Sequence, residues 1–132
     1  MNYMRIVKFL SAGLTALLVS SCAISPETQA KMDEYARTIP TCPSADQCRS
    51  NWSAARAWLV QNSDFSIRGE SAERIMATTN IISNSGIGVV INRVTTNSGY
   101  QILVDVECFS AYGCPDLWDL MLDFNRTVNA AN

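Results

Sequence analysis

The sequence contains no histidine among its 132 residues. Without histidine the chain cannot form a Ser-His-Asp or Cys-His catalytic arrangement, and it cannot bind a metal ion through imidazole. This absence excludes the commonest designs of hydrolases and zinc enzymes, so no cofactor or metal is expected. Carboxylate chemistry stays open, because 12 aspartate and glutamate residues are present.

Long apolar runs and basic clusters are also missing. The longest apolar stretch, 9–19, contains Ser11, Gly13 and Thr15 and is shorter than the roughly 20 residues that a transmembrane helix needs. The formal net charge is −2, with 10 Lys and Arg spread along the chain. Nucleic acid is therefore not an expected partner, and the acidic balance does not favour contact with anionic lipid headgroups.

The apolar stretch has the layout of a secretory signal. It follows Arg5 and Lys8, and it ends at Val19-Ser20-Ser21-Cys22. These four residues resemble the lipobox of a bacterial lipoprotein precursor. The alternative is an ordinary signal that the general peptidase cuts, with Cys22 incidental.

The lipoprotein resemblance implies a covalent anchor on Cys22. In that class the thiol receives a diacylglycerol, the signal is cut before the cysteine, and the new amine is acylated, for example with palmitate. Two or more acyl chains anchor stably, whereas one does not. Ala23, in place of the aspartate associated with inner-membrane retention, implies the outer membrane, facing the periplasm. The expected organisation is a signal peptide over 1–21, a lipidated tether over 22–43 and one small domain over 44–132.

Four further cysteines predict two disulfides, because an even number in an exported chain indicates a disulfide framework. Cys42 with Cys48, and Cys108 with Cys114, is the pairing we choose, since short loops close most readily. Pairing Cys48 with Cys108 is the main rival. A zinc site fits poorly, because structural sites favour two to four residues between paired cysteines.

Capping signals predict three helices. Ser25-Pro26-Glu27 begins a short helix over about 26–38, which is either a spacer above the membrane or packed on the domain. Ser44 and Gln47 form a capping box before a helix over 45–62, with Cys48, Trp52, Ala55 and Leu59 as its buried stripe. Pro115 suits the first position of a last helix over 115–129.

Between the last two helices the hydrophobic period changes to two, which predicts strands. The expected strands are 65–67, 75–81, 87–95 and 100–108. Short turns separate them, so neighbouring strands should be antiparallel. We therefore predict an α+β two-layer sandwich, in which an antiparallel sheet of three or four strands is covered on one face by the helices 45–62 and 115–129, with two disulfides.

Two acidic pairs are the candidates for catalysis. Asp105 and Glu107 share one face of a predicted strand, and Glu70 and Glu73 form the second pair. A glycosidase needs two carboxylates that flank one bond. Such pairs are common on solvated sheet faces, so we predict that neither pair is catalytic.

Aromatic residues give the candidate contact surface. Trp52, Trp58 and Trp118 all fall on predicted helices, and Tyr112 lies in the loop between two cysteines. Trp52 is assigned to the core by its place in the stripe. Trp58, Trp118 and Tyr112 are predicted to form a contact surface.

The remainder of the chain resembles small lipoproteins of proteobacteria, and no functional residue carries over from that resemblance. The sequence predicts a lipid-anchored, non-enzymatic protein that binds the membrane through Cys22 and another envelope protein through an edge strand or a helix face. The alternatives are a carboxylate enzyme that acts on peptidoglycan and an inhibitor of a host hydrolase that presents the loop 109–113.

Overall fold

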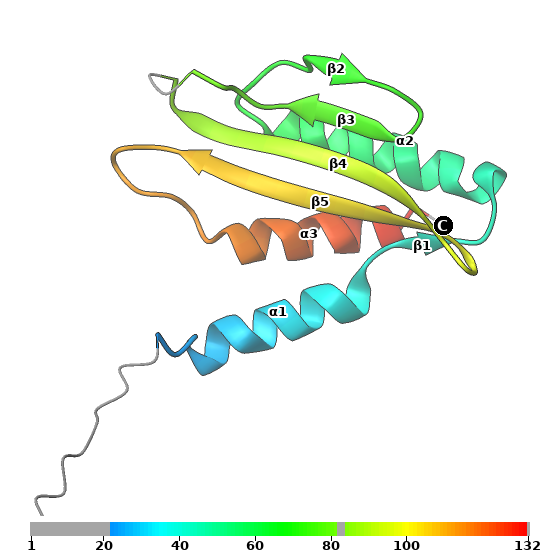
Figure 1. The fold of residues 1–132 in the computed structure, drawn as a ribbon, viewed down its shortest axis with the longest axis horizontal. Coiled ribbons are helices and arrows are strands. Elements are labelled where there is room, and N and C mark those ends of the chain that lie inside the picture. Colours follow the sequence, from blue (N-terminus) through cyan, green and yellow to red (C-terminus); the bar gives the residue numbers. More distant parts are fainter. Residues whose placement is uncertain (1–21, 82–83, 132) are drawn as a thin grey trace, which may run out of the picture.

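The computed structural model describes residues 22–81 and 84–131 (Figure 1). The predicted signal peptide, 1–21, lies outside the described residues. The elements, in chain order, are α1 (Pro26–Thr38), β1 (Thr41–Cys42), α2 (Ala45–Asn62), β2 (Gly69–Glu70), β3 (Arg74–Ala77), β4 (Gly86–Thr96), β5 (Gly99–Phe109) and α3 (Leu117–Asn129).

Side-chain caps set where the three helices begin. The Ser25 hydroxyl accepts from Thr28 N at 3.1 Å, and the Ser44 hydroxyl accepts from Gln47 N at 3.3 Å, so α1 and α2 begin as predicted. The predicted start of the last helix at Pro115 is wrong by two residues. Asp116 is the N-cap there and accepts from Trp118 N at 2.9 Å, which places Pro115 outside the helix.

The sheet has five antiparallel strands in the order β1-β5-β4-β3-β2. Its centre is the long hairpin of β4 and β5, in which Gly86 pairs with Phe109 at one end and Thr96 with Gly99 at the other. The two extra strands, β1 and β2, lie at the edges and contain two residues each. Such short strands carry no periodic pattern, which is why the prediction of three or four strands missed them.

The segment 65–67 does not form the predicted strand. The Ser63 hydroxyl lies 3.0 Å from Ala77 O and 3.2 Å from Ile87 O, and Asp64 N donates to Ile87 O. These contacts hold the chain after α2 against the ends of β3 and β4. Strand pairing starts only beyond Ile67, in β2.

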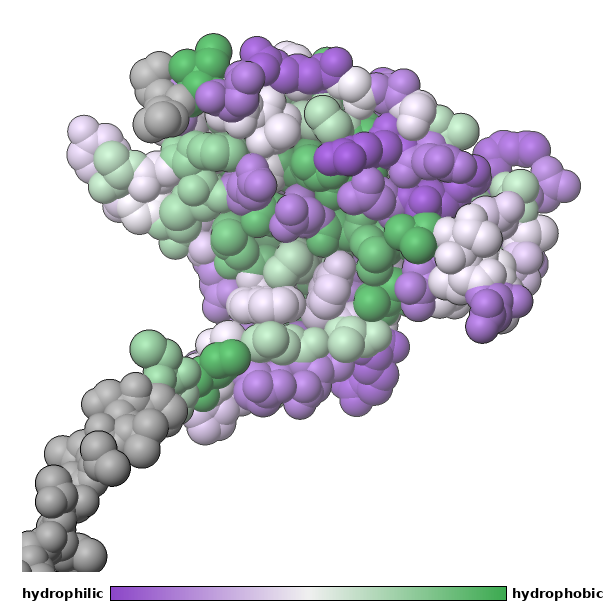
Figure 2. Space-filling view, viewed as in Figure 1, coloured by the Kyte–Doolittle hydropathy of each residue, from purple (hydrophilic) through white to green (hydrophobic). Residues whose placement is uncertain are grey.

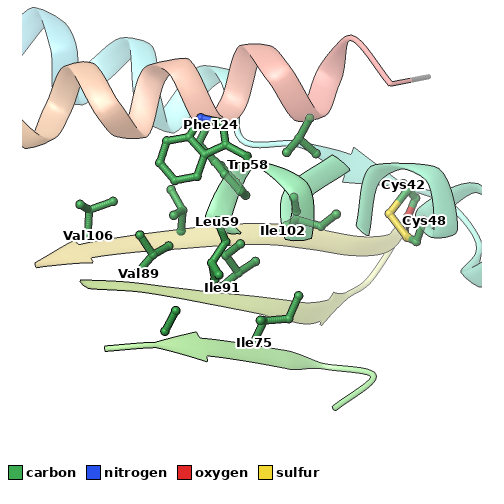
Figure 3. Packing of buried hydrophobic residues seen from close by; sticks show 14 residues of the cluster. Cys42, Cys48, Trp58, Leu59, Ile75, Val89, Ile91, Ile102, Val106 and Phe124 are labelled. Carbon is green, nitrogen blue, oxygen red and sulfur yellow. Dashed lines mark hydrogen bonds between the residues drawn. A yellow bond between two sulfur atoms is a disulfide. The ribbon is translucent and has the colours of Figure 1, made fainter. Parts of the chain in front are cut away.

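One face of the sheet is covered by α2 and α3, as predicted, and the core lies between these layers. Leu59 of α2 and Phe124 of α3 point toward Val89 and Ile91 of β4 (Figure 3). Burial of this apolar surface is the main source of stability of such a layer, at about 25 cal/mol per Å². The remaining buried apolar side chains of the core cluster are Cys42, Cys48, Ala55, Trp58, Ile75, Ala77, Ile102, Val104, Val106 and Val128.

The helix α1 packs on the domain. It lies alongside α3 (Figure 1), and the Tyr35 hydroxyl donates to Val104 O at 3.1 Å. Asn125 Nδ2 on α3 donates to Tyr35 O at 3.1 Å. Residues 26–38 are therefore joined to the domain that was expected to begin at residue 44.

Both predicted disulfides are present. Cys42–Cys48 joins β1 to the first turn of α2, with the Cα atoms 5.3 Å apart. Cys108–Cys114 joins the end of β5 to the segment before α3, with the Cα atoms 6.0 Å apart. Each bridge therefore fixes a place where the chain passes between the sheet and a helix. Across 22–81 and 84–131, none of the helices has the length and apolar character to cross a membrane.

Candidate interaction surface

The second face of the sheet is not covered by α2 or α3. Side chains alternate along β4 and β5, so the neighbours of the core residues point to this open face. Apolar side chains continue there across three strands, and Figure 2 shows hydrophobic groups gathered over the strands between hydrophilic ones. We call four of them the open-face stripe: Met76, Val90, Leu103 and Val94.

The strand register makes this stripe continuous. Met76 of β3 lies directly opposite Val90 of β4. Leu103 of β5 lies opposite Asn92, and is therefore diagonal to both Val90 and Val94. Diagonal neighbours are about 7–8 Å apart, within reach of each other's side chains. Val94 is 40% exposed, and the other three are half-buried, so the stripe presents apolar surface to solvent.

Two carboxylates border the stripe. Asp105 lies opposite Val90, and Glu107 lies opposite Gly88. The Thr78 hydroxyl donates to Glu107 Oε2 at 3.4 Å. Across 22–81 and 84–131, neither carboxylate takes part in an ion pair. The border therefore carries negative charge at Asp105 and Glu107, and positive charge at Arg74, which lies opposite Asn92 on the β3 side.

The same two carboxylates form one of the candidate catalytic pairs. A glycosidase keeps one acid protonated by surrounding it with apolar groups. Asp105 and Glu107 are both exposed on the sheet face. This placement agrees with a solvated strand face.

In the second acidic pair, Glu70 is engaged in an ion pair with Arg56. Arg56 of α2 binds Glu70 through two hydrogen bonds of 2.6 and 3.2 Å. These bonds lower the pKa of Glu70, so this carboxyl is held ionised and is unsuited to donate a proton. Glu73 is exposed, and its carbonyl oxygen accepts from Arg93 N.

The edges of the sheet are short or covered. On the β5 side, β1 pairs only with Tyr100 and Gln101, and beyond them Ile102 N donates to Pro40 O and Val104 O accepts from the Tyr35 hydroxyl. On the other side, β2 pairs with two residues of β3. Short edges of this kind discourage the addition of a strand. The open face is thus the larger candidate surface.

The three aromatic residues that were predicted as one contact surface differ in exposure. Trp58 is only 3% exposed, and its Nε1 donates to Asp123 Oδ2 at 2.7 Å. Trp118 is half-buried and packs edge-on against Tyr35, with the ring centroids 5.9 Å apart. Tyr112 alone of the three is fully exposed.

Three residues of the stripe predicted for α2, Cys48, Ala55 and Leu59, are buried, but the buried face is wider than predicted and also includes Trp58. The buried residues of α2 are Cys48, Asn51, Ala55, Trp58 and Leu59, whereas Trp52 is half-buried and packs against the core cluster. The spacing of three and four residues from Asn51 to Ala55 to Trp58 carried this signal. A polar residue at position 51 concealed it. Asn51 Nδ2 donates to Val128 O at 3.1 Å, whereas Asn51 Oδ1 is buried without a hydrogen-bond partner among the described residues.

A separate hollow lies at one end of the sheet. It has a volume of about 490 Å³ and lies between the connection after β3 and the loop after β5. Its lining is mostly uncharged and apolar or small. The residues are Asn80, Ile81, Asn84, Ser85, Phe109, Ser110, Ala111 and Tyr112.

Within the described residues, no three His, Cys, Asp or Glu side chains are placed to hold a metal ion. Cys22 is exposed and carries a free thiol. Comparison of the chain with protein-family models, with curated proteins and with solved structures finds no match.

Proposed function

We propose that this protein is a lipid-anchored envelope protein, held by Cys22 in the outer membrane on its periplasmic side. In this proposal it acts without catalysis, by binding another envelope protein. The observation that carries the binding role is the open-face stripe, which leaves apolar side chains of three strands uncovered.

The anchor is supported by the position of Cys22. The thiol is exposed and free, and it lies four residues before the start of α1 at Pro26. Because α1 packs on α3 and bonds to β5, a lipid on Cys22 would hold the folded domain at a short distance from the membrane. A mass spectrum of the mature protein that shows an unmodified amino terminus would remove the anchor from the proposal.

The chemistry of the stripe indicates the kind of partner. Interfaces combine an apolar centre with a polar rim, and here the rim carries Asp105 and Glu107. A complementary protein surface would be apolar at its centre and basic where it meets Asp105 and Glu107. We therefore expect binding to weaken when salt is raised, because rim charges are screened.

The binding role is tested by cross-linking in intact envelopes. A photoreactive amino acid at Val94, the most exposed member of the stripe, should give one discrete cross-linked partner. Leu103→Glu should abolish this product, because it places a charge in the centre of the apolar surface. Ser53→Glu, on the exposed face of α2, is the matched control and should leave it intact. Cross-linking that is unchanged by Leu103→Glu would refute the stripe as the binding surface.

The peptidoglycan alternative has its own test. Purified protein incubated with cell wall should release no soluble fragments. Release that is lost in Asp105→Asn or Glu107→Gln would replace the binding proposal with an enzymatic one.

A further inference from the structure

One end of the molecule is formed by segments without charged residues. The segments 22–26, 75–81, 84–92 and 108–115 contain no Asp, Glu, Lys or Arg. Pairing of Gly86 with Phe109 brings the start of β4 to the end of β5. Figure 1 shows the segment before α1, the end of the β3–β4 connection and the loop after β5 at the same end of the long axis. The 96–99 turn lies at the opposite end.

This uncharged end also exposes large hydrophobic side chains. Within the described residues, five are exposed, and Ile24, Ile81 and Tyr112 belong to this end, at 54%, 48% and 100%. Ile81 and Tyr112 lie on the two sides of the hollow of about 490 Å³. The other two, Val60 and Val94, lie on α2 and on the open-face stripe. Three of the five exposed large hydrophobic side chains therefore belong to segments at this end.

Two of the charged side chains that border this end, Lys31 and Asp64, are engaged within the molecule. Lys31 Nζ lies 2.7 Å from Asp116 and 2.8 Å from Asp119. Asp64 Oδ2 accepts from Ile87 N at 2.6 Å. Lys31 and Asp64 are thus engaged, whereas Glu107, opposite Gly88, is exposed and among the described residues accepts only from the Thr78 hydroxyl, so its carboxylate would have to stay hydrated if this end met an apolar surface.

We propose that this end seats on the lipid bilayer, with Tyr112 and Ile81 in the headgroup region. The inference rests on the lipid anchor of the proposed function, because the anchor emerges from the same end. Tyrosine suits the interface, since its ring is apolar and its hydroxyl stays hydrated. The headgroups that fit are zwitterionic, because this end offers no basic residues for anionic lipid.

The anchor makes this weak contact effective. Two or three apolar side chains bind a bilayer poorly by themselves, but a lipid on Cys22 turns the contact into an intramolecular one with a high effective concentration. Seating at this end directs the long axis away from the membrane (Figure 1). The open-face stripe then faces sideways, where an envelope protein can reach it.

Brominated lipids test the seating directly, because bromine quenches tryptophan emission at short range. Lipidated full-length protein is reconstituted in phosphatidylethanolamine and phosphatidylcholine vesicles with bromine on the upper acyl chain. Tyr112→Trp adds a probe at the uncharged end, and Asn97→Trp adds a matched probe on the exposed turn at the opposite end. The emission that each variant adds to the parent signal is compared with and without bromine.

The expected result is quenching of the added emission that is at least about twofold greater for Tyr112→Trp than for Asn97→Trp, as for a side chain 5–10 Å into the interface. Equal quenching, or none in either variant, overturns the seating. A blue shift of the Tyr112→Trp emission that depends on protein concentration and not on lipid overturns it too, in favour of a second copy of the chain as the occupant.

The outcomes separate this inference from the proposed function. Mass spectrometry on the same preparation reports the state of Cys22. Acylated Cys22 without selective quenching overturns the seating alone. Unmodified Cys22 overturns the anchor and the seating together. Absence of any Val94 cross-link in protein that is otherwise unchanged, with selective quenching retained, refutes partner binding and supports the seating.

Discussion

At the scale of single residues, a few polar groups on aromatic and amide side chains connect the helices to each other and to the sheet. Trp58 Nε1 joins α2 to α3 through Asp123, and the Tyr35 hydroxyl joins α1 to β5 through Val104 O. Asn125 Nδ2 joins α3 to α1 at Tyr35 O. Each donor is at least partly buried, so loss of its partner would leave it unsatisfied at a cost of about 1–3 kcal/mol.

Tyr35→Phe should destabilise the protein, because it removes only the hydroxyl that donates to Val104 O. The expected loss in the free energy of unfolding at pH 7 is about 1 kcal/mol, a typical net value for one hydrogen bond. Urea unfolding measures it. Arg37→Ala, on an exposed position of α1, is the control and should change the free energy much less.

The same variant predicts a pH dependence. Burial raises the pKa of Tyr35 above its ordinary value of 10.0, so the folded protein favours the neutral hydroxyl. The stability that this group contributes is complete below pH 10 and is lost as the pH rises through the folded-state pKa. The difference between the parent and Tyr35→Phe should therefore shrink in alkaline solution. A difference that stays constant from neutral to strongly alkaline pH would show that Tyr35 is not protected from ionisation.

At the scale of helices and strands, local chemistry determined what could be predicted. The starts of α1 and α2 could be predicted from Ser25 and Ser44, because the side chain of an N-cap bonds to a backbone N–H only three residues away. The hairpin of β4 and β5 follows from alternation over 11-residue strands. The two-residue strands β1 and β2 form only by pairing with other strands, so no local pattern in the sequence predicts them.

The candidate surface was less predictable than the fold, for a physical reason. Apolar residues on the open face, such as Leu103, look in the sequence like core residues of the same strand. Only the arrangement of α2 and α3 on one face shows which set is uncovered. The prediction of Trp58 as a surface residue was wrong because Trp58 packs in the core against Phe124 of α3, a contact between residues far apart in the sequence.

Ser44→Ala tests the role of capping in α2. The substitution removes the oxygen that accepts from Gln47 N, and N-cap losses of this kind cost about 1 kcal/mol. Ser53→Ala, at an exposed interior position of the same helix, is the matched control and should be neutral or slightly stabilising, because alanine favours helix interiors. Ser44→Ala should therefore have a lower melting temperature than both the parent and Ser53→Ala in thermal unfolding. Equal melting temperatures for the two variants would contradict the cap assignment.

At the scale of the whole molecule, α1 links the expected anchor to the surface that would bind a partner. Beyond its contacts with β5, α1 is held to α3 by Lys31, which bonds to Asp116 and Asp119 in and before the first turn of α3. This network lies next to the uncharged end. A lipid anchor on Cys22 would therefore orient the domain on a membrane only while α1 stays packed on α3.

Lowering the pH should weaken the packing of α1 on α3, because protonation of Asp116 removes its negative charge. The hydrogen bond from Lys31 lowers the pKa of Asp116 below its ordinary value of 3.8, so its contribution to docking is present above that value and is lost as the pH falls through the folded-state pKa. The two carboxylates in turn raise the pKa of Lys31, so its charge persists into strongly alkaline solution. Lys31→Met removes the ion-pair partner of Asp116. In this variant the α1 amides should be less protected from hydrogen exchange already at neutral pH, and their protection should depend less on acid.

Hydrogen exchange of the α1 amides, corrected for intrinsic rates, measures this docking, with the α2 amides as an internal reference. Arg49→Met, which breaks an exposed ion pair with Asp46 inside α2, is the matched control and should keep the acid dependence of the parent. If Lys31→Met and Arg49→Met behave alike, the network does not hold α1. If only Lys31→Met loosens α1, the same variant in vesicles should also lose the selective quenching of the Tyr112→Trp probe, because an undocked helix no longer transmits the orientation of the anchor to the domain.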